Sequence, residues 1–241
     1  SASMLGYNVL ITTSNAHDIS ELQSLVESNR VDGMLLTRAL EDDRALQYLS
    51  QANFPTALTG TCRYDNIIQV DTDNEGAAEK MTTLLIGKGF RRFAFLVKDM
   101  SYNVDRKRHE GFCRALIKNG ISEKDQLFYN GSIRMEFLDA IIENIISKKV
   151  ECIICGDDEI CTMVMSRLQA EGYRIPKDVA IASLYNSTNL DCYSPAVTAV
   201  SVAASQMGGT AVRQLIQRLR GENYEKKTML DYDILFRKST N

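Results

Sequence analysis

A cluster of cationic side chains opens a predicted helix directly after a predicted strand. The segment Asp105-Arg106-Lys107-Arg108 places three cations in the first turn of that helix, where the helix dipole favours anions. We therefore expect an ion pair or a ligand to compensate these charges. Arg108 lies four residues before Phe112, on the inward side of the helix, where its planar guanidinium could hold hydroxyl or carboxylate groups. Arg106 and Lys107 are expected on a solvated face, as most charges on helices are.

Two neighbouring carboxylates form a second candidate site. The segment Gly156-Asp157-Asp158-Glu159 follows an apolar predicted strand and begins the next helix. At the mouth of a parallel sheet, Asp157 and Asp158 could accept hydrogen bonds from a polyhydroxylated ligand. Either carboxylate could instead cap the helix N-terminus, where negative charge is favoured. An acid/base pair in an enzyme is a third use of the same residues.

Motifs typical of most enzyme classes are absent from the sequence. No glycine-rich phosphate loop and no Gly-x-Ser-x-Gly nucleophile turn occurs. His17 and His109 are the only histidines, so a histidine-based metal site is not expected. Cys152-x-x-Cys155 resembles a redox pair, but residues three apart in a strand point to opposite faces, which favours two buried thiols. We expect no catalytic activity, no metal and no cofactor.

The chain around these candidates alternates between apolar runs and amphipathic segments. Predicted strands such as 93–97 and 152–155 are apolar on both faces, as expected when helices cover both sides of a parallel sheet. The pattern predicts an α/β protein with doubly wound parallel sheets, which bind ligands at the carboxyl ends of their strands. Strands are predicted at 7–12, 31–36, 56–58, 67–70, 93–97, 126–129, 151–155, 179–183, 197–201 and 228–236, and helices at 18–29, 41–52, 73–88, 103–119, 134–148, 157–171 and 203–219.

Composition is typical of a soluble globular protein. Of 241 residues, 44% are hydrophobic and 24% are charged, and no apolar run reaches the roughly 18 residues of a membrane span. The net charge of −3 argues against a general nucleic-acid-binding surface. The first residues show no basic segment followed by an apolar one, so we expect no signal peptide, a cytoplasmic location and six reduced cysteines.

A series of short motifs follows one order along the chain. They are Val31-Asp-Gly-Met-Leu-Leu36, Val70-Asp-Thr-Asp-Asn-Glu-Gly-Ala77, Lys88-Gly-Phe-Arg-Arg-Phe-Ala94, Arg108-x-x-Gly-Phe-x-x-Ala-Leu116, Asp157-Asp158, Glu171-Gly-Tyr-Arg-Ile-Pro-Lys-Asp-Val179, Ser194-Pro-Ala-Val-Thr-Ala-Val200 and Phe236-Arg-Lys-Ser-Thr240. Their order resembles that of the lactose-repressor family of transcription regulators, and the resemblance covers essentially the whole chain.

The resemblance implies a periplasmic-binding-protein-like fold of two doubly wound parallel-sheet subdomains. We expect residues 1–70 with 194–221 in the N-terminal subdomain and residues 71–193 with 222–241 in the C-terminal one. It also implies that the region forms a homodimer, binds a small metabolite such as a sugar in the cleft between subdomains, and couples their closure to operator affinity. The alternative is a periplasmic or lipid-anchored sugar-binding protein of a transporter, which shares the fold. No membrane partner is expected for the regulator.

The resemblance also implies roles for single residues. Arg108 matches the family's effector-gripping arginine, Asp157 matches a ligand-contacting position, and Tyr102 falls at a lining position. Tyr185 replaces a carboxylate that commonly holds a ligand hydroxyl, and Ile133 replaces a ring-stacking aromatic, which together favour a ligand less typical or larger than a hexose. We expect Arg108→Ala to weaken binding with little change in melting temperature. The expected ligand-binding set is Arg108, Asp157, Tyr185, Asn186, Tyr102, Asp158 and Ile133.

The chain departs from the family pattern at its start. Gly6-Tyr-Asn-Val-Leu-Ile11 comes almost at once, whereas the family places a helix-turn-helix headpiece and then a strand and a helix before this segment. We expect these parts to be absent from the sequence, so operator DNA would be contacted only through a headpiece that it lacks. The family's first strand lies between the strands predicted at 7–12 and 31–36. We expect an equivalent strand either from a part of the molecule outside this sequence or from a partner, because a missing central strand leaves backbone groups unsatisfied.

Overall fold

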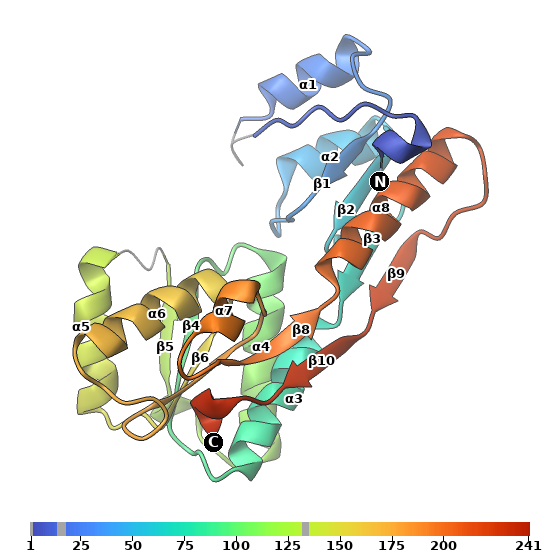
Figure 1. Ribbon diagram of the computed structural model, residues 1–241. Helices are drawn as coiled ribbons and strands as arrows, with labels where there is room; N and C mark the ends of the chain where they lie inside the picture. Colours follow the sequence, from blue (N-terminus) through green and yellow to red (C-terminus); the bar gives the residue numbers. More distant parts are fainter. Residues whose placement is uncertain (1, 14–17, 132–134) are drawn as a thin grey trace. The chain divides into compact units, whose positions relative to one another are not determined.

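The chain folds into two units, seen here in a computed structural model that describes residues 2–13, 18–131 and 135–241. Unit 1 comprises Ser1–Thr72 and Ala203–Leu230, and unit 2 comprises Asp73–Val202 and Asp231–Asn241. Each unit has its own sheet with helices packed on it (Figure 1), so the expected α/β class is confirmed. Each of the predicted helices is present, with ends within three residues of the predicted ones.

Unit 1 is built on a parallel sheet in the order β1-β2-β3-β9. Helix α8 packs against this sheet, and its buried Ala211 and Leu215 join Ala57, Ile68 and Val70 in one core cluster. Its elements are η1 (Ser3–Leu5), α1 (Ser20–Glu27), β1 (Met34–Leu36), α2 (Arg44–Gln51), β2 (Thr56–Thr59), β3 (Ile68–Thr72), α8 (Ala204–Leu219) and β9 (Lys227–Leu230).

The strand predicted at residues 7–12 is not formed, and that prediction was wrong. Val9, Leu10 and Ile11 are 62%, 57% and 86% exposed, although they are apolar. The physical reason is that a strand exists only where a neighbour completes its hydrogen-bond ladder. Within the described ranges β1 pairs with β2 alone, and no described residue forms the strand expected between β1 and residues 7–12.

Unit 2 contains a larger sheet in the order β10-β8-β7-β6-β4-β5, in which β10 runs antiparallel to β8 and the other pairs are parallel. Its strands are β4 (Phe93–Val97), β5 (Leu127–Asn130), β6 (Cys152–Cys155), β7 (Ala180–Ser183), β8 (Thr198–Val202) and β10 (Tyr232–Leu235). Its helices are α3 (Asn74–Gly87), α4 (Asn103–Lys118), η2 (Glu123–Asp125), α5 (Met135–Ser147), α6 (Asp158–Ala170), α7 (Thr188–Cys192) and η3 (Lys238–Thr240).

Helices cover both faces of the unit 2 sheet, as the doubly apolar strands predict. One core cluster joins the sheet to α5, α6 and α7, and the other joins it to α3 and α4. Cys155 lies in the first cluster and Cys152 in the second, so their side chains do point to opposite faces. All six cysteines are free thiols, and burial raises the pKa of Cys152, so it is not a reactive thiolate.

The boundaries between the units differ from the expected ones. The chain changes unit after Thr72, Val202 and Leu230, whereas the sequence predicts changes after residues 70, 193 and 221. Strand β8, expected in the N-terminal subdomain, pairs with β7 and β10 in unit 2. The single strand predicted at 228–236 is two strands, of which β9 pairs with β3 and β10 pairs with β8. One predicted strand thus contributes to two sheets, which its periodicity does not reveal.

A close approach of two helices explains one of the glycines in the motifs. At Gly111 on α4, an added Cβ would lie well inside van der Waals contact of the Glu75 carbonyl oxygen on α3, and 3.0 Å from the Ala78 Cβ. Only glycine therefore lets α4 lie this close to α3. The approach places Arg108, one turn earlier on α4, beside Asn74 at the start of α3.

Candidate functional site

The candidate residues gather at the carboxyl edge of the unit 2 sheet. Strands β4, β6 and β7 are adjacent and parallel, and the register places Leu96 opposite Cys155 and Cys155 opposite Ser183. The loops that follow these strands therefore leave the sheet side by side. Because ligands of open α/β sheets bind outside the carboxyl ends of the strands, this edge is the candidate binding site.

Arg108 is the most constrained cation at this edge. Its side chain points inward as predicted, and the residue is only 7% exposed. Its Nη1 donates to the Gly156 carbonyl oxygen at 2.6 Å, and its Nε donates to Asn74 Oδ1 at 3.2 Å. Gly156 has no room for a side chain, since an added Cβ would lie 2.9 Å from Val97 Cγ1. The guanidinium is therefore held by a backbone acceptor in the loop between β6 and α6 and by a side-chain acceptor at the start of α3.

Asp157 caps a helix, which is one of the uses considered for it, and it also forms an ion pair. Its Oδ1 accepts a hydrogen bond from the Ile160 backbone N–H at 2.9 Å, which caps α6, and its Oδ2 lies 2.9 Å from Lys98 Nζ. Burial works against the Lys98 charge, but bonds to Glu159 and Asp157 outweigh it and raise the Lys98 pKa. Asp158, the first residue of α6, is half-buried. The two oxygens of Asp157 are therefore engaged in a cap and an ion pair within unit 2.

Tyr185 and Asn186 follow β7 in a loop fixed by local hydrogen bonds. The buried Ser183 donates through Oγ to the Tyr185 carbonyl oxygen at 2.7 Å, so it holds the first turn of the loop. Arg237, near the C-terminus, donates through Nη1 to Asn186 Oδ1 at 2.9 Å and forms an ion pair with Asp191. The Asn186 oxygen is therefore engaged by a partner within unit 2.

For Tyr102 and Ile133, two of the predicted ligand-binding residues, the structure gives little information about a binding role. Tyr102 lies directly before α4 and is half-buried. Ile133 lies outside the described residues, so the structure gives no account of its place. Arg106 and Lys107, expected on a solvated face, are half-buried instead, and Arg106 Nη2 donates to Asn103 Oδ1 at 3.0 Å.

Sequence reasoning missed three residues that the structure places around the site. Lys98 directly follows β4, so its position after an apolar strand was the available signal. Asn74 is the first residue of α3, and its contact with Arg108 joins residues 34 positions apart, which no local pattern reveals. Arg237 is in the tail motif, but its contact with Asn186 spans 51 positions.

This arrangement offers fixed hydrogen-bond donors and acceptors. Arg108 donates to the Gly156 carbonyl oxygen, and the Asp157 carboxylate pairs with Lys98 and accepts from the Ile160 N–H. Within the described ranges, no group of three or more His, Cys, Asp and Glu side chains is placed to hold a metal ion.

Comparison with known proteins identifies the chain. It matches the family described as periplasmic binding protein-like domain over residues 82–240. The chain belongs to this family. A relative described as HTH-type transcriptional regulator CelR, from Thermobifida fusca, is 26% identical over 237 residues, which are 96% of this chain and 70% of the relative.

Solved structures agree with this assignment. A transcription regulator like protein from Staphylococcus haemolyticus has a TM-score of 0.89 and 27% identity, covering 99% of this chain and 86% of that one. A structure described as a transcriptional regulator CelR–cellobiose complex has a TM-score of 0.86 and 26% identity, covering 98% and 75%. The expected resemblance to the lactose-repressor family is confirmed, and the comparisons favour the effector-binding region of such a regulator over a transporter's binding protein. In the described ranges, no helix is long and apolar enough to cross a membrane.

Proposed function

We propose that this region binds a polyhydroxylated small molecule, a sugar or sugar derivative, at the carboxyl edge of the unit 2 sheet. The main support for this proposal is the buried Arg108 guanidinium, which donates to the Gly156 carbonyl oxygen. The next residue, Asp157, forms the ion pair with Lys98. Hydroxyl groups both donate and accept, so they match a rigid set of mixed donors and acceptors. The cellobiose bound by a similar regulator supports a sugar as the ligand.

The proposed contact residues keep the roles expected from the sequence. Arg108 and Asn186 donate hydrogen bonds, and Asp157 and Asp158 accept them. Tyr185 offers a phenol ring where related regulators commonly have a carboxylate, so an apolar sugar face or a larger, less typical ligand fits this position better. Tyr102 and Ile133 complete the proposed set as lining residues.

The proposal is tested first with a thermal-shift screen, because a ligand that binds the native state raises its melting temperature. Cellobiose, monosaccharides, sugar phosphates and nucleosides form the screen. The affinity of a positive compound is then measured by calorimetry for the wild type and for Arg108→Lys, which keeps the charge but loses the planar fork. Arg174→Lys is the matched control, because Arg174 is an exposed arginine that pairs with Asp178 and is not one of the proposed contact residues.

We expect Arg108→Lys to weaken binding roughly tenfold or more, since a charge-assisted fork is worth about 1.5–3 kcal/mol, while Arg174→Lys binds like the wild type. Equal affinities for the wild type and Arg108→Lys would exclude Arg108 from the site. A screen in which no sugar or sugar derivative raises the melting temperature would reject the proposed ligand class.

We further propose that the regulator is a cytoplasmic homodimer without catalytic activity, in which ligand binding changes operator affinity by favouring one conformation. Light scattering of the purified chain gives its oligomeric state, and a monomer at micromolar concentration would contradict the dimer. Chromatography of the bound sugar after long incubation tests for turnover, and recovery of the unchanged sugar is expected.

A further inference from the structure

Positive charge is concentrated at the amino edge of the unit 2 sheet, opposite its carboxyl edge. The segments 88–92, 148–151 and 173–178, here called the basic edge, lead into the adjacent strands β4, β6 and β7. They carry seven Lys and Arg residues, all exposed, and two Glu and Asp residues. Their charge is therefore +5 in a chain whose net charge is −3. The residues that lead into the neighbouring strand β5 include Glu123 and Asp125, so the positive region ends there.

The two carboxylates of the basic edge already have partners within unit 2. Glu151 accepts hydrogen bonds from the backbone N–H groups of Arg91 and Arg92 at 2.6 and 3.1 Å. Burial disfavours the Glu151 charge, but these hydrogen bonds and the nearby arginines lower its pKa. Asp178 pairs with Arg174, whose hydrogen bonds lower the Asp178 pKa to about 2. Both carboxylates are thus ionised and held in place, and the positive excess remains after they are counted.

Helix dipoles explain part of this positive charge. Lys88 directly follows the end of α3, and Lys148 and Lys149 directly follow the end of α5, where a helix dipole favours cations. Lys177 lies well beyond the end of α6, so no helix dipole explains it. A helix dipole also needs no hollow surface beside the cations, and the basic edge has one.

The basic edge surrounds a cavity of about 710 Å³. Among its charged lining residues are four half-buried residues with apolar or aromatic side chains, Phe90, Ile146, Tyr173 and Pro176. Phe90 packs against the core cluster of α3 and α4, whereas Ile146 and Tyr173 pack against the cluster of α5, α6 and α7. The cavity thus offers apolar surface among exposed cations, a lining that suits a partner with both charged and apolar side chains.

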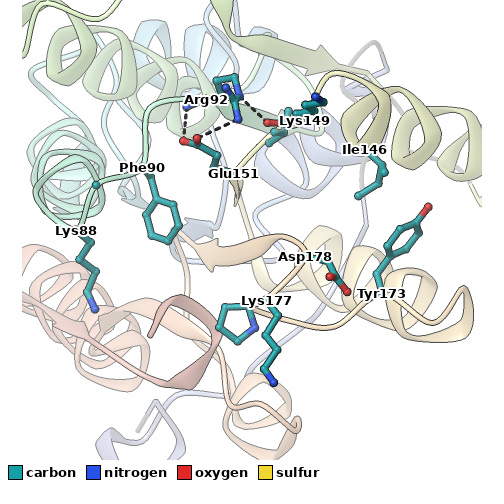
Figure 2. A pocket seen from close by; sticks show the side chains of 12 residues that line it. Lys88, Phe90, Arg92, Ile146, Lys149, Glu151, Tyr173, Lys177 and Asp178 are labelled. Atoms are coloured by element: carbon teal, nitrogen blue, oxygen red, sulfur yellow. Dashed lines mark hydrogen bonds and ion pairs between the residues drawn. The ribbon is translucent and has the colours of Figure 1, made fainter.

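The cations around this cavity lie apart from one another. Figure 2 shows Lys149 and Lys177 at opposite ends of it. A small ion with one charge can therefore approach only one of them closely. An extended chain with several carboxylates can engage both, and because each exposed ion pair is weak, several pairs are needed for useful affinity.

We propose that the basic edge binds an acidic segment of a partner protein in which carboxylate and apolar residues alternate. The carboxylates pair with Lys148, Lys149 and Lys177, and the apolar side chains lie on Phe90 and Tyr173. Complementary charge of this kind speeds association and selects the partner. The backbone of a nucleic acid matches the charge but brings no apolar side chain to the cavity. None of the described residues proposed for the sugar lines the cavity, and this proposal does not depend on the sugar.

The test uses the ¹⁵N-labelled full chain and a peptide of Glu-Glu-Leu repeats as the probe, followed through backbone amide shifts. A Lys-Lys-Leu peptide of the same length keeps the apolar residues and reverses the charge. An oligoglutamate of the same charge keeps the carboxylates and lacks the leucines. A DNA duplex tests whether a nucleic acid binds the same surface more tightly.

The triple variant Lys148→Gln, Lys149→Asn, Lys177→Gln removes three ammonium groups of the basic edge. Asparagine tolerates the left-handed backbone at position 149, where φ is +54°, so this variant should fold. The matched control variant removes the same charge at three exposed lysines outside the basic edge, namely Lys80→Gln, Lys118→Gln and Lys226→Gln.

With the Glu-Glu-Leu peptide, we expect saturable shifts at residues 88–92, 148–151 and 173–178 in the wild type and in the control variant. The triple variant should bind this peptide about tenfold more weakly, because three exposed ion pairs are lost. The Lys-Lys-Leu peptide should not bind, and the oligoglutamate should bind more weakly than the Glu-Glu-Leu peptide.

The proposal is overturned by an absence of saturation, by shifts that map elsewhere, by binding of the Lys-Lys-Leu peptide, by equal binding of the oligoglutamate, or by tighter binding of the DNA duplex. Equal affinities of the triple variant and the control variant would also overturn it. That last result would assign the lysines to helix dipoles and to solvation of the surface.

Discussion

The packing of α3 against α4 at Gly111 makes a prediction that can be worked out from distances. Replacing Gly111 by alanine adds a Cβ at 3.0 Å from the Ala78 Cβ and closer still to the Glu75 carbonyl oxygen. The first contact alone requires a separation of about 0.4 Å, the difference from the 3.4 Å at which ordinary contact begins. Because the second contact is with backbone, no side-chain rotation relieves it, and the helices must move apart.

Overpacking of this kind costs about 1–3 kcal/mol, and a backbone clash belongs at the upper end. Alanine recovers about 1 kcal/mol through its higher helix propensity. The net loss is therefore about 2 kcal/mol, which lowers the melting temperature of a chain of this size by about 4–8 °C. The displacement should also lengthen the Arg108 to Asn74 hydrogen bond, so sugar affinity should fall with stability.

Differential scanning calorimetry measures the change and resolves the two units if they unfold separately. Gly87→Ala is the matched control, because Gly87 ends the same α3 and an added Cβ there meets nothing within 4 Å. That variant should gain about 0.5 kcal/mol from reduced unfolded-state freedom. A Gly111→Ala protein that melts within about 1 °C of the wild type, or above it, would refute the close approach of α3 and α4.

Three further perturbations have definite expected outcomes. Arg108→Ala should destabilise unit 2 by about 2–4 kcal/mol in urea unfolding, because two buried acceptors lose their donor. The structure thus replaces the sequence-based expectation that the melting temperature stays nearly unchanged. A loss below about 0.5 kcal/mol would contradict the burial of the guanidinium. Arg237→Ala should lower the free energy of unfolding by about 2 kcal/mol, because it removes the hydrogen bond to the Val197 carbonyl oxygen, 2.6 Å away, and the ion pair with Asp191. Calorimetry measures this change, and an equally stable variant would show that these Arg237 contacts do not stabilise the unit. Burial favours neutral His109 and lowers its pKa below 6.5, despite nearby Glu123 and Glu110. The stabilising contribution of neutral His109 is therefore present above pH 6.5 and is lost as the pH falls further. His109→Gln should reduce the loss of stability measured by urea midpoints between about pH 6.5 and 5, and a pH profile identical to that of the wild type would contradict this prediction.

Much of unit 2 could be predicted because its sequence patterns are local and strong. Phe93–Val97 is apolar on both faces and forms a fully buried strand, and the Cys152 and Cys155 thiols lie on the opposite faces that their spacing predicts. Arg108 could be placed inward because Phe112, one turn later, marks the buried side of α4. In each case one residue's environment follows from neighbours within a single turn or strand.

The remaining errors come from interactions that connect distant parts of the chain. Residues 7–12 have a strand's composition but lack a described partner, and composition alone does not supply one. The run 228–236 has continuous strand character, yet its two halves pair with β3 and β8. Likewise, the contact of Arg237 with Asn186 depends on the fold of the whole unit, so the tail motif gives no sign of it.

The division of the chain into interrupted units has a consequence for its synthesis. Chains emerge from the ribosome N-terminal end first, and domains generally fold as they emerge. Here the unit 1 sheet receives β9 and its covering α8 only from residues 203–230, and unit 2 receives β10 only from residues 231–241. A nascent chain that has reached Val202 therefore still exposes Ala57, Ile68 and Val70, which α8 later covers. We expect chaperones that hold exposed apolar strands to act on this protein until the last few dozen residues have been added.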